Sequence, residues 1–284
     1  MPLVTTKDML IRAKRGGYAV GAFNAENMEM AQAIIFAAKE LNAPVIIQTT
    51  PSTLRYASLD LFWGNIEALA KNTGVPVALH LDHGDSFDLC AQALRAGYTS
   101  VMIDGSRLPL DQNIALTRRV VEICSPSGVP VEGEIGCVGG KEDDSEGRSG
   151  YTVPAEAVSF ESETGVSSMA VGIGTAHGVY RAEPVLDMRL LRKLVESISS
   201  PLVLHGASGL TDSAIRECVR EGICKVNFAT ELRIAYSEGV RQVLCGEVSV
   251  FDPKTYGKSG RSRVQELVME RIKVCGCDGK AAYG

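Results

Sequence analysis

Short apolar segments of strand length alternate with segments of helical pattern along most of the chain, and this alternation limits the fold more than any other feature of the sequence. The apolar segments are rich in Val, Ile, Leu and Ala, which is typical of strands buried on both faces of a parallel sheet. Eight strands are predicted: Tyr18–Phe23, Pro44–Gln48, Pro76–His80, Thr99–Asp104, Val129–Ile135, Ser168–Gly174, Pro201–His205 and Ile223–Asn227. Eight strands that alternate with helices predict an α/β fold, the (β/α)8 TIM barrel.

The segments between these strands carry apolar residues at helical spacing. The predicted helices are Thr6–Arg15, Asn27–Leu41, Leu59–Lys71, Phe87–Arg95, Asn113–Ile123, Pro154–Thr164, Asp187–Ser197 and Thr211–Glu221. Two extra C-terminal helices, Glu231–Leu244 and Arg261–Val274, follow the eighth strand, joined by a connection that contains Pro and Gly. Residues 229–284 would therefore form helices that cap the barrel or contact another subunit. No change in composition marks a boundary, so residues 1–284 are predicted to form a single barrel domain.

Charge and cysteine content exclude several classes of protein. The net charge is −5 and the pI is about 5.5, which argues against a surface for nucleic acid or for an anionic membrane. The N-terminus lacks the pattern of a signal peptide, and no apolar run is long enough to span a membrane, so we expect a cytoplasmic protein. The eight cysteines are dispersed and form no C-x-x-C pair, which favours reduced thiols over disulfides or a zinc knuckle at Cys275-Gly276-Cys277.

One long segment has no periodic pattern. Residues 136–150 contain five glycines and a cluster of charged side chains. Loops of this length in a compact domain are usually lids or disordered segments. The sequence therefore predicts a mobile, exposed loop here.

The four histidines of the chain all lie at the C-terminal ends of predicted strands, or just beyond them, and these ends converge in a barrel. A single histidine at a strand end is more often a hydrogen-bonded core residue than a ligand, but here three strands carry one. His83, His177 and His205 would supply three nitrogens to a divalent metal ion and leave a position open for substrate, which is the arrangement of a catalytic zinc site. His80 is expected to have a supporting role.

Acidic residues stand at the end of the strand that precedes His83 and at the ends of the next two predicted strands. Asp82 is adjacent to His83 and would either cap the following helix or act as a general acid and base, and we favour the second role. Asp104 and Glu134 would be alternative metal ligands or partners that orient the histidines. Ordinary roles in turns and salt bridges are equally compatible with these two acids.

Two segments end the last two predicted strands: the small residues Gly206–Gly209 after the seventh strand and Asn227–Thr230 at the end of the eighth. These two loops often bind phosphate in such barrels, through backbone N–H groups at helix N-termini. A turn of small residues is weak evidence by itself, because Gly and Ser are good turn formers. The two turns beside a metal site indicate a phosphorylated substrate that is held without a basic patch.

Taken together, these motifs closely resemble the class II, zinc-dependent ketose-bisphosphate aldolases. The motifs are His80-Leu81-Asp82-His83, Gly174-Thr175-Ala176-His177-Gly178, Leu204-His205-Gly206-Ala207-Ser208-Gly209 and Lys225-Val226-Asn227-Phe228-Ala229-Thr230. The likeness extends from Gly21-Ala22-Phe23-Asn24 to Cys275-Gly276-Cys277. The length and the C-terminal ending look most like the tagatose-bisphosphate branch, with the shorter fructose-bisphosphate aldolases close to it.

The resemblance implies reversible cleavage of a ketohexose 1,6-bisphosphate to dihydroxyacetone phosphate and glyceraldehyde 3-phosphate. It implies that His83, His177 and His205 bind Zn²⁺, that Asp82 exchanges the proton of the C4 hydroxyl, and that Glu142 handles the proton of the enediolate. The substrate-binding residues that it implies are Asn24, Gly178, Gly206, Ala207, Ser208, Asn227, Phe228, Ala229 and Thr230. It also implies a monovalent cation, Na⁺ or K⁺, near the phosphate, a homodimer or homotetramer, and in some members an accessory subunit.

Some features stay open at this point. Phe228 stands where Val or Ile is usual, and Gly84 replaces a common His or Cys. Arg55, Arg181 and Arg261 of a neighbouring subunit are alternatives for binding the distal phosphate. Tagatose and fructose bisphosphates differ only at C4, and the sequence does not choose between them.

Other activities are less compatible with the sequence. Barrel hydrolases ordinarily carry His-x-His on the first strand, which has no histidine here. A non-catalytic subunit would not need the three histidines and Asp82 together. An aldolase of the same family that acts on another phosphorylated ketose is a further alternative.

Overall fold

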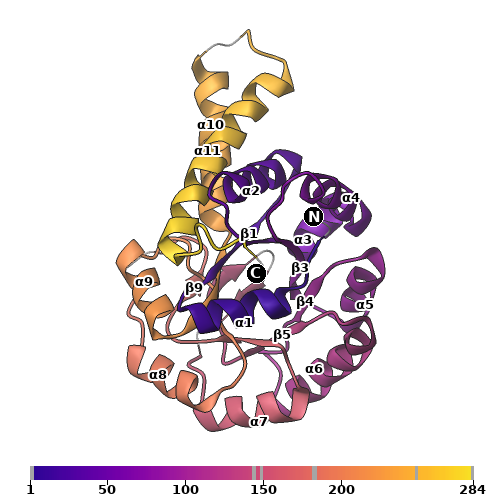
Figure 1. Cartoon of the computed structure of the whole chain (residues 1–284), viewed down its shortest axis with the longest axis vertical. Coiled ribbons are helices and arrows are strands. Elements are labelled where there is room, and N and C mark those ends of the chain that lie inside the picture. Colours follow the sequence, from indigo (N-terminus) through magenta and orange to yellow (C-terminus); the bar gives the residue numbers. More distant parts are fainter. Residues whose placement is uncertain (1–2, 143–144, 148–149, 181–183, 247–248, 283–284) are drawn as a thin grey trace.

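Eight parallel strands close into a barrel in which consecutive barrel strands of the chain are neighbours (Figure 1). This confirms the (β/α)8 barrel. The computed structural model describes residues 3–142, 145–147, 150–180, 184–246 and 249–282. The barrel strands are β1 (Val20–Asn24), β2 (Val45–Thr49), β3 (Val77–Gly84), β4 (Ser100–Ile103), β5 (Val131–Ile135), β8 (Ser168–Val171), β10 (Leu202–Leu204) and β11 (Ile223–Phe228).

Helices surround the barrel, and most of them differ by no more than a few residues from the predicted ranges. Their bounds are α1 (Thr6–Gly16), α2 (Met28–Glu40), α3 (Pro51–Ala57), α4 (Leu59–Ala70), α5 (Phe87–Ala96), α6 (Leu110–Cys124), η1 (Ser125–Ser127), α7 (Pro154–Thr164), α8 (Met188–Ser197), α9 (Asp212–Glu221), α10 (Thr230–Gly246) and α11 (Pro253–Cys275). Polar caps fix several N-termini: the side chains of Asn27, Ser86 and Thr211 each accept a hydrogen bond from a backbone N–H in the first turn. The short helix α3 was not predicted.

Helix α1 covers the N-terminal end of the barrel. Met9, Leu10 and Ala13 on its inner face pack against the first inward residues of the strands, among them Ile46 and Ala78. The other end of the barrel, where the strands terminate, is therefore the end that remains for a site.

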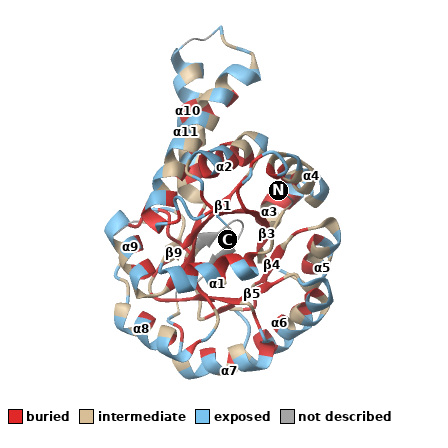
Figure 2. Ribbon diagram, viewed as in Figure 1, coloured by how far each residue is buried: buried red, intermediate tan, exposed pale blue. Residues whose placement is uncertain are grey.

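The barrel strands are buried (Figure 2), but the side chains inside the barrel are not all apolar. The outward side chains of the strands join the helices in one large apolar core. Inside the barrel, Gln48, His80, Glu132 and Lys225 are all between 0% and 1% exposed. The prediction of strands buried on both faces is confirmed, but this polar layer was not expected.

The segment predicted to be a loop forms a small second sheet. Strands β6 (Gly139–Glu142) and β7 (Ser145–Gly147) pair antiparallel, and β6 also pairs with β9 (Ala176–His177). Gly140 has φ of 87°, and a Cβ there would overlap the carbonyl oxygen of His177. The prediction of an irregular loop was wrong at these strands because glycine here permits close strand pairing rather than breaking it.

Helices α10 and α11 pack on each other and project from the barrel as an arm (Figure 1). Helix α11 begins at Pro253 rather than at Arg261, so the connection is shorter than predicted. A Cβ on Gly239 would lie 2.6 Å from the carbonyl oxygen of Ser259, so this glycine permits the close contact of the two helices.

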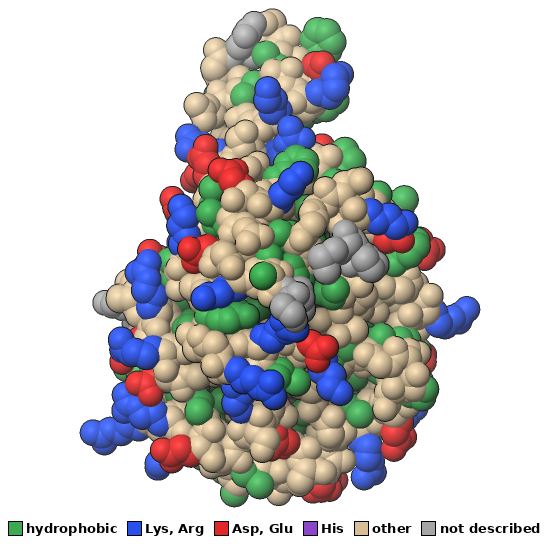
Figure 3. Space-filling view, viewed as in Figure 1, with side chains coloured by type: hydrophobic (Ala, Val, Ile, Leu, Met, Phe, Trp, Pro, Cys, Tyr) green, Lys and Arg blue, Asp and Glu red, His purple; other side chains and the backbone are tan. Residues whose placement is uncertain are grey.

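The surface seen in Figure 3 mixes Lys and Arg with Asp and Glu, and no histidine is visible on this face. All eight cysteines are free thiols. Within the described residues, no helix combines the length and the apolar character needed to cross a membrane.

Candidate active site

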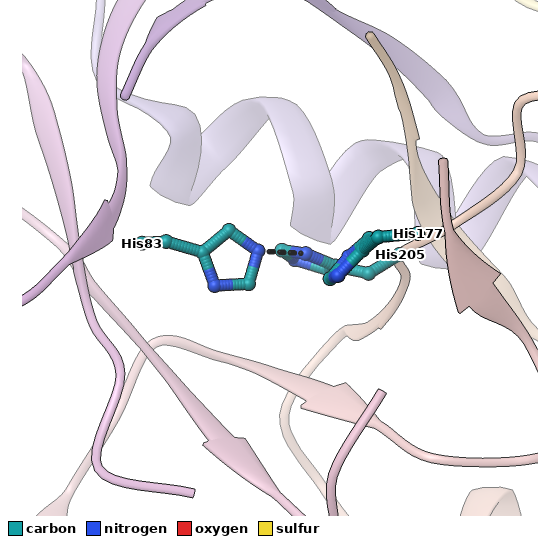
Figure 4. Close-up of side chains that lie close together, drawn as sticks. All are labelled: His83, His177 and His205. Carbon is teal, nitrogen blue, oxygen red and sulfur yellow. Dashed lines mark hydrogen bonds between the residues drawn. The ribbon is translucent and has the colours of Figure 1, made fainter. Parts of the chain in front are cut away.

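The three histidines predicted to bind a metal converge from three separate segments (Figure 4). The ring centroids of His83 and His205 lie 4.7 Å apart, those of His83 and His177 5.1 Å, and those of His177 and His205 5.9 Å. One nitrogen from each ring can face a common point, so the set can hold a metal ion.

His83 owes its position to an irregularity at the end of β3. The strand continues to Gly84, so His83 lies within it and not beyond it as predicted. The pairing register with β4 shifts between Leu81 and Gly84, and His83 has φ of 47°. A residue other than glycine rarely adopts this conformation, which costs about 1–3 kcal/mol, and such strained residues cluster at functional sites.

A carboxylate binds the outer nitrogen of His83. Asp104 Oδ2 lies 2.9 Å from His83 Nδ1, and Glu134 Oε2 lies 4.0 Å from the same nitrogen. Burial alone would raise the pKa of Asp104, but the hydrogen bond and charge of His83, together with bonds from Ser106, hold that pKa below its ordinary value. Asp104 therefore lies where it can orient the ring and keep its proton on Nδ1.

His205 has a matching partner deeper in the barrel. Its Nε2 lies 2.8 Å from Glu132 Oε1, and Glu132 Oε2 lies 2.9 Å from Lys225 Nζ. Burial alone would raise the pKa of Glu132, but the charge of Lys225 and the bond from His205 hold it well below its usual range. Burial lowers the pKa of His205, which favours the neutral ring that a metal requires.

In each of these two rings, the nitrogen that does not bond a carboxylate faces the other ring. His83 Nε2 and His205 Nδ1 are 2.9 Å apart, and Figure 4 shows this contact. A carboxylate only accepts hydrogen bonds, so each ring carries its proton on the outer nitrogen and directs a lone pair inward. Two facing lone pairs are stabilised when a cation lies between them, so these residues fit a divalent metal ion.

Asp104 and Glu134 give a second donor set with His83. Glu134 Oε1 accepts a hydrogen bond from the backbone N–H of Val138 at 3.2 Å. Both sets contain His83, but its Nε2 faces His205 and its Nδ1 faces the two acids. The geometry is therefore compatible with the alternative in which Asp104 and Glu134 are themselves metal ligands.

Asp82 is buried and held by amides on neighbouring strands. Asn24 Nδ2 donates to its Oδ2 at 2.9 Å, and Asn227 Nδ2 donates to its Oδ1 at 3.3 Å. Gln48 Nε2 in turn donates to Asn24 Oδ1 at 2.9 Å, which directs the amino group of Asn24 toward the carboxylate. These bonds fix the orientation of an acid that is 1% exposed.

His80 has the supporting position predicted for it. Its Nδ1 lies 2.7 Å from Ser100 Oγ, and Ser100 also accepts a hydrogen bond from Thr6 in α1. Burial, followed by the charge of Lys225, lowers the pKa of His80 well below its ordinary value. The neutral ring thus links the active-site end of the barrel to its N-terminal cover.

A pocket joins the histidines to the predicted phosphate loops. Its lining consists of Asn24, Asp82, His177, Gly178, His205, Gly206, Ser208, Asn227, Ala229, Thr230 and Arg233. The backbone N–H of Ala229 donates to Ser208 Oγ at 3.1 Å, so the two loops contact each other. Tyr180 Oη further ties this region together by donating to the carbonyl of Gly206 at 2.8 Å.

Two predicted substrate-binding residues are absent from this lining. The side chain of Ala207 is buried in the apolar core. Phe228 also points into the core, where its ring stacks on Phe23 with centroids 5.4 Å apart. Only the backbone of these two residues is available to contact a ligand. Phe228 ends β11, where alternate side chains face opposite sides, and Ala207 lies in the turn after β10.

The other predicted residues are spread more widely. Glu142 lies in β6, and its side chain lies outside the described part of the chain, as does Arg181. Arg261 donates to Gln32 Oε1 of its own chain at 2.7 Å. Arg55 lines a different pocket, together with Asp60, Asp85 and Arg95.

Four functional candidates were missed by sequence reasoning: Gln48, Glu132, Lys225 and Arg233. Glu132 and Glu134 are two residues apart on the fifth predicted strand, so they share one face of it. Lys225 lies within a predicted strand and Gln48 at the end of another. A polar residue in an otherwise apolar strand was the sequence feature that could have identified them. Arg233 lies in the first turn of α10, after the phosphate loop, and pairs with Glu26 at 2.6 Å.

Comparison with known proteins identifies the family of the chain. The profile of the family Fructose-bisphosphate aldolase class-II matches residues 4–280. The structure is similar to that of the YdjI aldolase from Escherichia coli K12, with a TM-score of 0.88 and 33% identity, over 99% of this chain and 100% of that one.

Two further solved structures are similar. A candidate fructose-1,6-biphosphate aldolase from Coccidioides immitis has a TM-score of 0.89 and 28% identity, over 96% of each chain. Fructose-bisphosphate aldolase from Campylobacter jejuni has a TM-score of 0.83 over 98% of this chain and 97% of that one, and at 23% identity it supports the fold alone. The family match over nearly the whole length and the likeness to YdjI show that this chain belongs to the class-II fructose-bisphosphate aldolase family.

Proposed function

We propose that this aldolase uses Zn²⁺ to cleave a ketohexose 1,6-bisphosphate reversibly into dihydroxyacetone phosphate and glyceraldehyde 3-phosphate. The observation that supports the proposal is the pair of facing nitrogens, His83 Nε2 and His205 Nδ1, which lie 2.9 Å apart. His205 lines one pocket together with the buried Asp82 and the two loops predicted to bind phosphate. His83, His177 and His205 would hold the ion. When bound, Zn²⁺ would act as a Lewis acid on the substrate carbonyl.

Asp82 is the residue proposed to move a proton. It lines the same pocket as His177 and His205, and the amides of Asn24 and Asn227 hold its two oxygens. A buried carboxylate with fixed orientation can accept the proton of the substrate C4 hydroxyl during cleavage and return it during condensation. Asn24, in this arrangement, positions Asp82 as well as lining the substrate pocket.

The phosphate of the dihydroxyacetone half is proposed to bind at the loops Gly206–Ser208 and Asn227–Thr230. Helix α10 begins at Thr230, so its first backbone N–H groups are directed at this part of the pocket. Arg233 supplies a cation at the pocket wall, where Glu26 is its partner. A guanidinium and a helix N-terminus together suit a phosphate group.

Several parts of the proposal come from the family resemblance. Glu142 is proposed to handle the enediolate proton from strand β6, and Na⁺ or K⁺ is proposed near the phosphate. A cytoplasmic location stays a prediction. Tagatose and fructose bisphosphates, and other phosphorylated ketoses, are alternatives for the substrate.

Parallel kinetics with the two epimeric bisphosphates tests the proposal most directly. We expect cleavage of at least one of them by the purified chain, with release of dihydroxyacetone phosphate. Preference is measured as the ratio of kcat/KM for the two sugars. Activity that needs an added second protein would identify the chain as dependent on an accessory subunit, and absence of cleavage with either sugar in both conditions would contradict the proposed substrate.

We also propose a homo-oligomer, a homodimer or homotetramer. Met28, Tyr56 and Leu61 are 52%, 81% and 68% exposed and line an apolar pocket, and Phe251 beyond helix α10 is 90% exposed. Exposed apolar patches of this kind often mark contacts between proteins. Light scattering on the purified chain should give a multiple of the 30.3 kDa chain mass, and a monomer at all concentrations would contradict this.

A further inference from the structure

Lys225 on β11 and Glu132 on β5 form an ion pair inside the barrel. Lys225 Nζ lies 2.9 Å from Glu132 Oε2, and the side chains are 0% and 1% exposed. Strands β10 and β8 separate β11 from β5, so the pair spans the interior. Burying two charges costs several kcal/mol for each ion, and an apolar pair of the same volume is often as stable. Stability alone is therefore a weak reason for a charged pair at this position.

The pair is connected to a proposed metal ligand. Glu132 Oε1 lies 2.8 Å from His205 Nε2, while Oε2 binds Lys225 and lies 3.5 Å from Ser168 Oγ. The two oxygens of the carboxylate thus have different partners. The bond from Lys225 fixes the side chain of Glu132 with Oε1 directed at the ring.

The direction of this bond decides which nitrogen of His205 carries the proton. A carboxylate accepts a hydrogen bond and does not donate one, so the proton of the neutral ring lies on Nε2. Nδ1 then keeps its lone pair and faces His83 Nε2 at 2.9 Å. A histidine can bind a metal only through the nitrogen that lacks a proton, and a fixed partner on the other nitrogen keeps it so.

We propose that Lys225 is a positioning residue for the metal-binding nitrogen of His205: it holds the Glu132 carboxylate in place, which keeps the ring proton on Nε2 and Nδ1 available to the metal. This inference rests on the proposed metal-dependent function. Lys225 is fully buried and does not line the substrate pocket described above, so it acts through Glu132 and His205 and does not touch substrate.

Replacing Lys225 by methionine keeps an unbranched side chain, shorter by the terminal amino group, and removes the charge. Glu132 then loses the partner that fixes its orientation, and His205 Nε2 loses a fixed acceptor. Both ring tautomers become populated, and the affinity for Zn²⁺ falls. Loss of an outer partner of a metal-binding histidine typically reduces metal affinity about 10–100-fold.

The experiment uses the full-length, metal-free protein and two measurements. Nitrogen-15 NMR of the four histidines reports which ring nitrogen is protonated, with the His205 signals identified by their loss in His205→Asn. Titration calorimetry with Zn²⁺ alone gives the metal affinity. Lys225→Met is compared with Lys71→Met, in which a surface lysine with a 58% exposed side chain loses its charge, and with Lys225→Arg, which keeps the charge.

We expect the Nε2–H tautomer for His205 in the wild type, in Lys71→Met and in Lys225→Arg, and a mixture of tautomers in Lys225→Met with zinc affinity about 10–100-fold lower. A folded Lys225→Met protein with unchanged tautomer and affinity would overturn the proposal. If Lys225→Met does not fold, an Nδ1–H tautomer in the wild type or in folded Lys225→Arg would overturn it. A wild type that bound no zinc would contradict the proposed function, while the tautomer measurement would still decide the role of Lys225.

Discussion

Asn24 donates a hydrogen bond from Nδ2 to Asp82 Oδ2 at 2.9 Å, and it does so because Gln48 binds the other end of its amide. An amide group can turn over and exchange its donor and acceptor. The bond from Gln48 Nε2 to Asn24 Oδ1 selects the orientation in which the amino group faces the carboxylate. Gln48 thereby supports the proposed proton carrier without contacting it.

We expect Gln48→Leu to lower kcat about 10-fold, since Gln48 orients the bond from Asn24 to the Asp82 carboxylate, and a hydrogen bond to a charged group contributes about 1.5 kcal/mol. The zinc content should not change, because none of the three histidines contacts this bond. Thr49→Val is the matched control: Thr49 is also buried on β2 but bonds Tyr98, away from the interior. Equal losses of kcat in the two variants would mean that Gln48 only stabilises the strand.

Asp82→Asn should keep the metal and lose most of the turnover, by about 10²–10⁴-fold, because an amide cannot accept a proton from the substrate hydroxyl. His205→Ala should lose the metal itself. Metal analysis of both purified variants separates the two roles. Equal metal loss in both would identify Asp82 as a ligand or a structural residue.

Asp104→Ala should weaken zinc binding about 10–100-fold without abolishing it, because Asp104 orients His83 through Nδ1 in the proposed arrangement. The control is Asp88→Ala, which removes an exposed acid on the nearby helix α5. Zinc titration of the two metal-free variants measures the difference. Complete loss of zinc binding in Asp104→Ala would show instead that Asp104 is itself a ligand.

Arg233→Met should raise KM for the phosphorylated ketose about 10–100-fold and change kcat little, because a charge-assisted bond to phosphate contributes about 1.5–3 kcal/mol. Arg216→Met is the control, since Arg216 pairs with Asp212 on an exposed helix surface. Initial rates over a range of substrate concentrations measure both constants. An unchanged KM in Arg233→Met would remove Arg233 from the proposed phosphate site.

The barrel and the three histidines could be predicted because both depend on local signals. Most barrel strands are short apolar runs, and each of the three histidines lies at or a few residues after the end of a predicted strand. The small sheet of β6, β7 and β9 could not be predicted. The glycines of β6 allow another segment to approach closely, but in a sequence glycine usually indicates a turn or a loop. Gly140 is the example: its partner, His177, is distant in the sequence.

The orienting partners of the site were harder to predict than its ligands. Glu132 and Lys225 are oppositely charged, but the ion pair depends on the strand order and the inward direction of both side chains. The shift in register that places His83 within β3 is likewise a property of the pairing with β4. The side chain of Phe228 points into the core because of its strand position, which the family motif alone does not reveal.

Metal removal tests the central claim, that the three histidines form a catalytic zinc site. Cleavage of fructose and tagatose 1,6-bisphosphates is assayed before chelation, after chelation and dialysis, and after addition of Zn²⁺. We expect activity with at least one sugar, its loss in the metal-free protein, and its return with about one zinc ion per chain. Full activity in the metal-free protein would contradict the account.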